Sequence, residues 1–253
     1  MSPLPQMVQA MKLCLSGIDS RIGHIPFSVL EQSQYVLESF FYVDEKYMSY
    51  YLSRDIFILD SGAFTFLNSA KTSVNWDAYV AKYVDFINRY DIRFFFEMDI
   101  DKIVGLTKVE QYRSFIERET GKRCIPVWHK SRGLAYWHYL CRNYDYVAIG
   151  GIAIKDIPQK DHKYFREFTR IAKQWGAKVH GLGCTSADCE KHGFFSVDSS
   201  SWGAGGRFGQ LHMFNGKRME IIRPSGKRAK DYLQIDRHNF IEWCAYQRYL
   251  DKL

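Results

Sequence analysis

The sequence lacks any run of about 20 uncharged apolar residues, which is the length that a membrane-spanning helix needs. Its N-terminal segment, MSPLPQMVQAMKLC, also lacks the basic region and the apolar run of a secretory signal peptide. Both absences predict a soluble, cytoplasmic protein with no membrane partner.

Paired cysteines are missing as well. The six cysteines are scattered and none forms a CxxC pair, so we expect reduced, mostly buried thiols rather than a disulfide framework. One local group, Cys184, Cys189 and His192, lacks both a clear fourth ligand and a standard zinc-site spacing. The sequence therefore predicts neither a metal site nor a cofactor.

Motifs that mark several common enzyme classes are absent. The sequence contains no P-loop, no GxGxxG, no HExxH and no GxSxG. Phosphoryl transfer, nicotinamide binding and zinc-peptidase chemistry therefore have no support from the sequence.

Positive charge is in excess and is unevenly distributed. The formal net charge is +7, and a basic segment at about residues 216–230 holds six cations: Lys217, Arg218, Arg223, Lys227, Arg228 and Lys230. Such a segment can be an ordinary solvated surface. It can also contact phosphates, because neutralising phosphates releases counterions and drives binding. The second interpretation favours a nucleic acid as partner.

Short apolar runs alternate with amphipathic segments along the chain. Eight runs are typical of strands buried on both faces: residues 12–17, 35–43, 56–62, 93–101, 124–129, 145–151, 177–183 and 194–200. The run 35–43 would also fit a helix. Eight strands with helices between them predict an α/β fold, a (β/α)8 TIM barrel that residues 1–253 form as a single domain. An open doubly wound sheet is the alternative.

Helical periodicity marks several segments between these runs. From residue 76 to residue 90 the apolar side chains fall on one stripe, as in a helix that packs on a sheet. Thr107 and Glu110 have the spacing of a capping box at the start of the next helix, and Asp161 can cap a later one. A closing helix is expected from about Asn239 to Leu250.

The barrel interpretation places an active site at the carboxyl ends of the strands. Acids, imidazoles or glycines end most of the predicted strands: Asp60, Asp99, Asp101, His129, Gly150, Gly151, His180, Gly181 and Asp198. Turn formation or helix capping would explain any one of them, but it explains the whole set poorly. Two carboxylates at converging strand ends suit glycosyl chemistry, in which one attacks the anomeric carbon and the other moves a proton.

Five short motifs follow one another at these strand ends: 60-DSGAF-64, 97-EMDID-101, 150-GGIA-153, 180-HGLG-183 and 198-DSSSWGAGGRFG-209. The ordered set resembles the tRNA-guanine transglycosylase superfamily, whose members exchange guanine for a 7-deazaguanine on a nucleoside. The resemblance covers roughly residues 56–210. It implies a barrel without a cofactor, and family members often form homodimers.

The resemblance also implies roles for individual residues. Asp198 would be the nucleophile at the sugar C1′, and Asp60 the general acid and base for the departing and incoming bases. Asp99, or Asp101 in its place, would recognise the purine edge. The other substrate contacts would come from Ser61, His129 (where the family often has a glutamine), Gly150, Gly151, His180, Gly181 and Arg207, the last of them near phosphate. The serine- and glycine-rich stretch after Asp198 would let a nucleotide sugar approach that carboxylate.

Two features depart from the tRNA enzymes. Those enzymes carry a zinc site of three cysteines and a histidine after the nucleophile, whereas here only Cys244 follows Asp198, and this chain is far shorter. A compact version without the zinc-binding subdomain resembles the phage and bacterial branch that places 7-deazaguanines into DNA. The incoming base would be 7-cyano-7-deazaguanine or a relative.

The sequence thus predicts a DNA-guanine transglycosylase. Three alternatives stay open: exchange on tRNA, a barrel without catalysis that binds nucleic acid as a partner subunit, and a glycosidase acting on carbohydrate.

Overall fold

Eight parallel strands form one continuous sheet. The computed structural model describes residues 10–19, 22–62, 65–66, 74–184, 189–223 and 231–253. The strands are β1 (Lys12–Ser16), β2 (Tyr35–Ser39), β3 (Ile56–Asp60), β4 (Phe94–Phe95), β5 (Val127–Trp128), β6 (Tyr146–Ile149), β7 (Lys178–Gly181) and β8 (Ser196–Ser199). Each of the eight predicted runs contains a strand, including 35–43, which holds β2 and not a helix.

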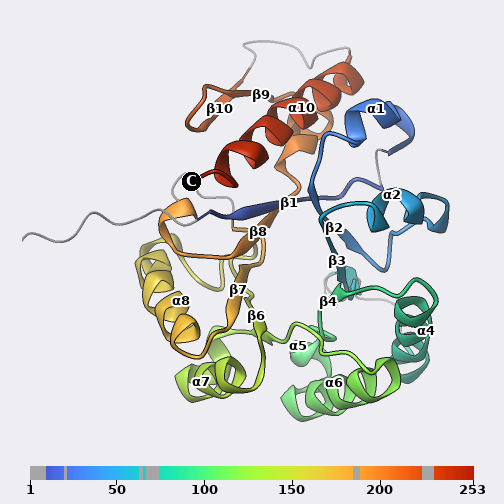
Figure 1. The fold of residues 1–253 in the computed structure, drawn as a ribbon, viewed down its shortest axis with the longest axis vertical. Coiled ribbons are helices and arrows are strands. Elements are labelled where there is room, and N and C mark those ends of the chain that lie inside the picture. Colours follow the sequence, from blue (N-terminus) through green and yellow to red (C-terminus); the bar gives the residue numbers. More distant parts are fainter. Residues whose placement is uncertain (1–9, 20–21, 63–64, 67–73, 185–188, 224–230) are drawn as a thin grey trace, which may run out of the picture.

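The sheet curls until its two end strands approach each other (Figure 1). The strand order is β4-β3-β2-β1-β8-β7-β6-β5, so β1 pairs with β8. Next to β4 and β5, a parallel bridge joins Phe96 to Ile125. The Glu97 amide donates to the Ile125 carbonyl (3.1 Å), and the Ile125 amide donates to the Phe95 carbonyl (2.8 Å). This topology is compatible with the predicted barrel, and the described strands show no reversal of order as in a doubly wound sheet.

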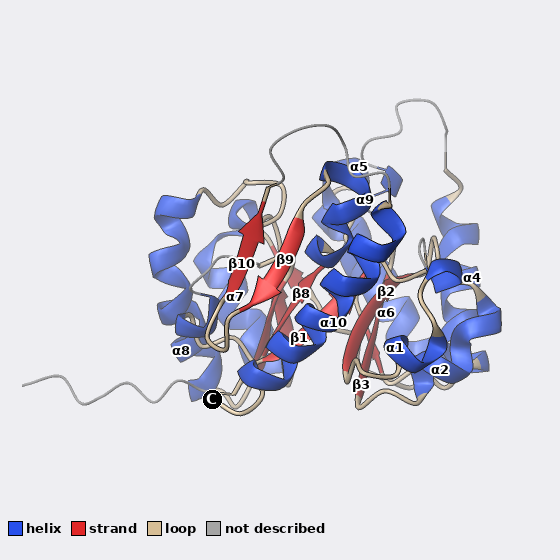
Figure 2. Ribbon diagram, turned by 90° about the horizontal axis from the view of Figure 1, so that it is seen from above, coloured by secondary structure: helices blue, strands red, loops and turns tan. Residues whose placement is uncertain are grey.

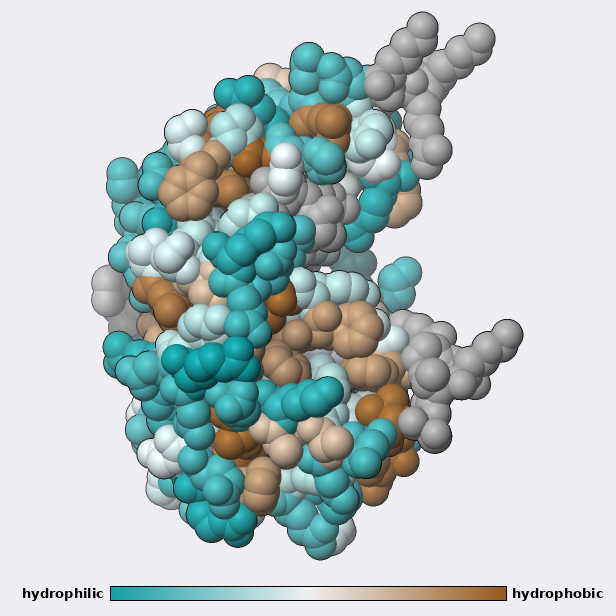
Figure 3. Space-filling view, turned by 90° about the vertical axis from the view of Figure 1, so that its right-hand side faces the viewer, coloured by the Kyte–Doolittle hydropathy of each residue, from teal (hydrophilic) through white to brown (hydrophobic). Residues whose placement is uncertain are grey.

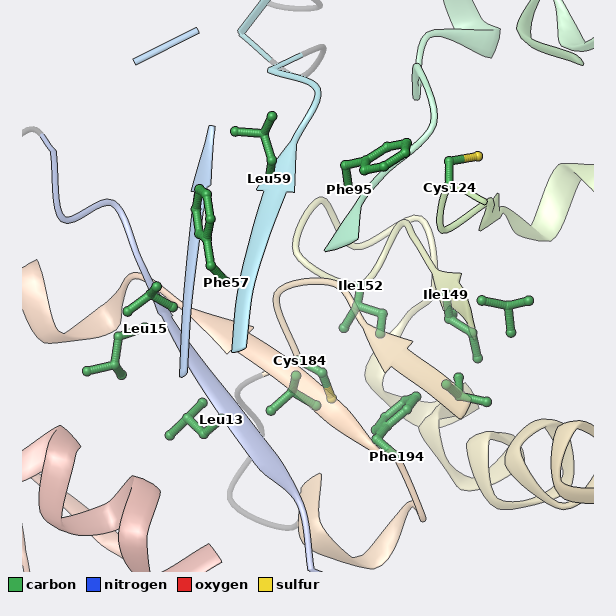
Figure 4. Packing of buried hydrophobic residues seen from close by; sticks show 14 of the residues in the cluster. Leu13, Leu15, Phe57, Leu59, Phe95, Cys124, Ile149, Ile152, Cys184 and Phe194 are labelled. Atoms are coloured by element: carbon green, nitrogen blue, oxygen red, sulfur yellow. The ribbon is translucent and has the colours of Figure 1, made fainter. Parts of the chain in front are cut away.

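Side chains alternate between two apolar clusters along the strands, as their period of two requires. Leu13 and Leu15 of β1 belong to the large core between the sheet and the helices (Figure 4). Cys14, between them, belongs to a second cluster, which fits the concave face of the curl. That cluster also holds side chains of four other strands: Tyr35, Leu37, Ile58, Val127, Tyr146 and Ala148. Burial on both faces explains why the strands are apolar runs without a polar side.

Helices follow most strands and cover the outside of the sheet (Figure 1, Figure 2). They are α1 (Phe27–Leu30), α2 (Met48–Leu52), α4 (Trp76–Arg89), α5 (Asp101–Val104), α6 (Leu106–Thr120), α7 (Gly133–Asn143), α8 (Phe165–Gln174), α9 (Ala204–Phe208) and α10 (Tyr232–Leu250). The predicted stripe of α4 is confirmed, because Val80, Tyr83, Val84 and Ile87 are buried in the core. In the part of the chain that is described, no helix is long and apolar enough to cross a membrane.

Two predicted helix caps are wrong. The N-cap of α6 is Gly105, with a φ of 82° that L side chains rarely adopt. Thr107 therefore lies inside the helix and forms no capping box with Glu110. Asp161 lies in a 3-10 helix before α8, Gln159–Tyr164, and pairs with the Lys130 ammonium at 3.1 Å instead of capping α8.

The last helix begins earlier than predicted and ends next to β1. It starts at Tyr232, not near Asn239, because the Asp231 side chain accepts a hydrogen bond from the third residue beyond it, at the Gln234 amide (3.2 Å). At its other end, the Leu250 carbonyl accepts a hydrogen bond from the Met11 amide (3.0 Å), next to β1.

The segment after β8 is helical rather than an open loop. A 3-10 turn, Ser201–Gly203, leads into α9, and an antiparallel hairpin, β9 (Leu211–Phe214) and β10 (Met219–Ile222), leads on toward α10 (Figure 2). A Cβ atom on Gly205 would lie 2.5 Å from the Ile235 Cγ2 atom, and one on Gly206 would lie 2.9 Å from the Asp236 Oδ2 atom. The close packing of α9 on α10 explains these two glycines without the approach of a sugar, which stays a prediction for the rest of the segment.

A buried ion network holds the ends of β4 and β5 together. The Glu97 carboxylate accepts a hydrogen bond from the Val127 amide (3.0 Å) and pairs with Arg132 Nη1 (2.9 Å) and Arg113 Nε (3.2 Å). Each of these three charged side chains exposes 4% of its surface or less. Burial acts to lower the pKa of Arg132, but the charge of Glu97 and of two nearby aspartates raises it above its usual value, so the guanidinium stays charged.

We expect Glu97→Gln to lower the free energy of unfolding by about 3–5 kcal/mol, because two buried guanidinium groups lose the buried carboxylate that they share. Urea denaturation measures this. The matched control is Glu119→Gln, since Glu119 pairs with Arg118 at the surface and such pairs contribute about 0–1 kcal/mol. Equal losses in the two variants would contradict the importance of the network.

Candidate active site

Side chains at the carboxyl ends of the strands line one cavity of about 230 Å³. Alternation along the strands places Asp60 on the same face of β3 as Ile58, and Asp198 on the same face of β8 as Ser196. The lining comes from every strand end except that of β1: Leu37, Asp60, Asp99, Asp101, Lys102, His129, Gly150, Gly151, Ala153, Ile154, Leu182, Gly183 and Asp198.

The cavity lies on the side of the molecule marked by α5 and α9, which follow β4 and β8 (top of Figure 2). The outline of the molecule is hollowed on this side in the space-filling view (right-hand edge of Figure 3).

Asp198 is held by the loop after β7. Its Oδ1 atom accepts a hydrogen bond from the Gly183 amide (2.6 Å) and lies 3.3 Å from the His180 Nε2 atom. Its Oδ2 atom lies 3.4 Å from the Ser16 hydroxyl, which is a long contact. One carboxylate oxygen is therefore firmly bound, while the other keeps acceptor capacity for a ligand.

Asp60 carries a carboxyl group whose pKa lies well above the usual value of an aspartate. Burial raises the pKa of Asp60 to about 7, against hydrogen bonds from the Gly62 and Ser61 amides that lower it, and the charges of Asp99 and Asp198 raise it further. The Gly62 amide donates to Asp60 Oδ2 at 2.9 Å. A carboxyl group that titrates near neutral pH can give and take a proton, as general acid–base catalysis requires.

Asp99, Asp101 and His129 form a polar wall of the cavity. The His129 Nε2 atom lies 2.7 Å from Asp99 Oδ1, and Arg132 Nε donates to Asp101 Oδ2 at 3.0 Å. Asp99 exposes 23% of its side chain and Asp101 exposes 14%. Both acids line the cavity, but Asp99 is the more accessible and is not held by a close arginine contact, which makes it the better candidate for ligand recognition.

His129 is polarised by its neighbour. Burial acts to lower the pKa of His129, but the charge of Asp99 and the hydrogen bond between them raise it above its usual value. The Nδ1 atom of His129 is buried and has no hydrogen-bond partner among the described residues.

The same wall brings possible metal ligands together. One ligand atom each of Asp99, Asp101 and His129 lie within 4.8 Å of one another, and within the described ranges Cys184, Cys189 and His192 form no such group. A cation at the wall would have to compete with the Arg132 guanidinium and with the hydrogen bond from His129 to Asp99. The donor set therefore fits the edge of a base better than it fits a metal ion.

Gly150 and Gly151 both line the cavity and make room within it. A Cβ atom on Gly150 would lie 2.6 Å from the His129 Cε1 atom, so a larger residue would displace the imidazole. Gly151 has a φ of 82°, which favours glycine.

Two predicted substrate contacts, His180 and Gly181, do not line the cavity. His180 is fully buried and lies behind Asp198. Gly181 faces the outer core, since a Cβ atom there would lie 3.1 Å from Phe194. The amide that approaches Asp198 belongs to Gly183, the second glycine of the same motif.

Ser61 and Arg207 also lie away from the lining. Ser61 is fully buried, and its carbonyl accepts a hydrogen bond from the Tyr79 hydroxyl (2.8 Å). Arg207 is exposed on α9 and donates to the Ser200 carbonyl at 3.0 Å.

Sequence reasoning missed part of the site. Lys102 directly follows the EMDID motif and pairs with Asp156 across the loops after β4 and β6 (2.5 Å), and this position could have been found from the motif. Arg132 comes three residues after His129 and carries no motif signal. The other missed lining residues are Leu37, Ala153, Ile154, Leu182 and Gly183.

The predicted basic segment is described only in part. Lys217 and Arg218 lie in the exposed turn of the β9–β10 hairpin, and Arg223 is exposed just beyond β10. Figure 2 shows β9 running away from the side that carries α9, so this turn lies at the far end of the hairpin. Lys227, Arg228 and Lys230 lie outside the described residues.

In comparisons with models of protein families and with curated proteins, nothing matched this chain.

We expect Asp198→Asn to lower the pKa of Asp60 from about 7 toward its usual value of 3.8, because one of the two repelling charges is removed. Burial keeps the shift partial. Carbon-13 NMR titration of the Asp60 carboxyl group measures it. Asp85→Asn, which changes an exposed aspartate of α4, is the control without effect, and an unchanged or raised pKa in the Asp198 variant would contradict the coupling.

Proposed function

We propose that this protein is a (β/α)8-barrel transglycosylase that exchanges guanine in a nucleic acid for a 7-deazaguanine. The observation that carries the proposal is that Asp60 and Asp198 line one cavity in different environments. Asp198 is bound by an amide on one oxygen, and Asp60 titrates near neutral pH. Two carboxylates with separate roles are what base exchange at C1′ needs.

The exchange proceeds by two displacements. An Asp198 oxygen attacks the sugar C1′, the C1′–N9 bond breaks, and protonated Asp60 gives its proton to the departing guanine. The deazaguanine then gives its N9 proton to the Asp60 carboxylate, its N9 attacks C1′, and the bond from C1′ to Asp198 breaks. Both carboxyl groups return to their starting states, and two inversions retain the configuration at C1′.

The polar wall of the cavity supports recognition of a purine. Asp99 can accept hydrogen bonds from the N–H groups of a guanine edge, and the His129 imidazole beside it lies in the same wall. Gly150 and Gly151 leave the backbone accessible to a flat ligand.

Several surface features support a polymer as substrate. Ile103 on α5 and Ile154 in the segment after β6 expose 44% and 37% of their surface, where bases next to an extruded nucleotide can pack. Arg223 and the net charge of +7 favour a phosphate backbone. Resemblance to the zinc-free branch makes DNA the proposed polymer.

Incubation with DNA that carries labelled guanine tests the activity. With a 7-deazaguanine present, the wild type is expected to release the label and Asp198→Ala to release none, because the nucleophile is lost. Asp85→Asn is the control that keeps activity. If the wild type releases labelled guanine from tRNA but not from DNA, the substrate is RNA. Label retained on both would refute the proposal.

The pH dependence of guanine release tests the role of Asp60. Release in the first turnover needs protonated Asp60, so its rate is expected to fall as the pH rises above about 7. Asp60→Asn should slow release by about 10²–10⁴-fold and remove this dependence. The measurement is the single-turnover rate of guanine release by the wild type and by Asp60→Asn across the neutral pH range. A variant that keeps the wild-type pH profile would exclude Asp60 as the acid.

A further inference from the structure

A chain of buried hydrogen bonds leads to the Asp198 carboxylate from behind the cavity. The His180 Nε2 atom lies 3.3 Å from Asp198 Oδ1, and the His180 Nδ1 atom lies 2.6 Å from the Ser196 hydroxyl. The Ser196 hydroxyl is hydrogen-bonded in turn to the Tyr146 hydroxyl. His180 and Ser196 are fully buried, and the mechanism above uses none of these three side chains.

When the imidazole is neutral, one assignment of donors and acceptors satisfies every group in this chain of hydrogen bonds. An ionised carboxylate only accepts hydrogen bonds, so His180 Nε2 carries the proton and donates to Asp198. His180 Nδ1 is then an acceptor, and Ser196 donates to it. Burial raises the pKa of Tyr146, so this hydroxyl keeps its proton and donates to Ser196.

We infer that His180, oriented by Ser196 and Tyr146, is a positioning residue that holds Asp198 Oδ1 and leaves Oδ2 to attack the sugar. The inference deepens the proposed function and rests on it. Oδ1 has two donors, the Gly183 amide at 2.6 Å and His180 at 3.3 Å, whereas among the described residues Oδ2 has only the 3.4 Å contact with Ser16. The oxygen with the fewest donors keeps the lone pairs that bond formation needs.

These donors affect the two halves of the exchange in opposite ways. Hydrogen bonds to a carboxylate lower its basicity, which weakens its attack on C1′. In the ester formed through Oδ2, Oδ1 is the carbonyl oxygen. When the incoming N9 attacks C1′, the electron pair of the C1′–Oδ2 bond goes to the carboxylate, and the donors on Oδ1 stabilise its charge. Loss of His180 should therefore slow breakdown of the covalent intermediate more than its formation.

The experiment uses the full chain, DNA with labelled guanine and a 7-deazaguanine, and it measures protein–DNA adduct on denaturing gels beside guanine release. In His180→Phe, breakdown of the adduct is expected to slow about 10- to 100-fold, so that adduct accumulates while first-turnover release continues. Ser196→Ala should act in the same direction with a smaller effect. His180→Gln, whose amide nitrogen can donate, should restore breakdown. His138→Gln on α7 is the matched control outside the cavity lining.

Less adduct together with slower guanine release in both His180→Phe and Ser196→Ala would overturn the inference, since a purely structural role predicts that result. Nitrogen-15 NMR of the wild type is a second test that needs no exchange activity. A neutral His180 with its proton on Nε2 supports the chain, and a proton on Nδ1 contradicts it. If the wild type releases no guanine, the proposed function fails while the NMR result still judges the direction of the chain.

Discussion

The buried ion pair between Glu97 and Arg132 is the interaction on which both the sheet and the cavity depend. β4 and β5 have two residues each, fewer than any other strand of the sheet, and one isolated bridge joins their neighbourhoods. Glu97 binds the Val127 amide at the start of β5 and the Arg132 guanidinium beyond its end. The same guanidinium also pairs with Asp101 at 3.0 Å and lies 3.8 Å from Asp99. The Arg132 side chain thus links Glu97, where the sheet closes, to the acidic residues of the cavity wall.

Asp60 and Asp198 show how surroundings can divide one functional group into two roles. Asp198 lies on a strand flanked by β1 and β7, and donors from the loop after β7 bind its Oδ1 atom. Asp60 is half-buried, accepts hydrogen bonds from the Gly62 and Ser61 amides and lies near two other negative charges, and its proton is held to about pH 7. The distinction lies in the surroundings of each carboxylate, which vary between strands even when the sequence places the same residue at their ends.

The strands and the two carboxylates could be predicted because both follow from local patterns. Apolar runs that are buried on both faces can be recognised in the local sequence, and an aspartate at or near the end of such a run, as at Asp60 and Asp198, indicates the carboxyl end of the strand. The assignment of Gly181 fails for a physical reason that a strict count of the strand period could have detected. His180 points toward the interior, so Gly181 must point away from it.

Contacts between distant segments could not be predicted. The need for glycine in α9 arises only when α10 lies against it, and the position of Arg132 has meaning only beside Glu97. The N-cap of α6 is Gly105 and not the predicted Thr107, because Gly105 adopts a backbone conformation that the spacing of Thr107 and Glu110 does not reveal.

The closure of β1 has a consequence for the order in which the protein acquires its structure. β1 leaves the ribosome before every other strand of the sheet, yet its partner β8 follows about 180 residues later, and the Met11 amide next to β1 pairs with the carbonyl of Leu250, which follows later still. Until then one edge of the growing sheet offers unpaired amides and carbonyls. The cavity, which needs Asp198 beside Ser16, thus forms only after β8 has been made, and until then the nascent chain must be protected from pairing with other strands.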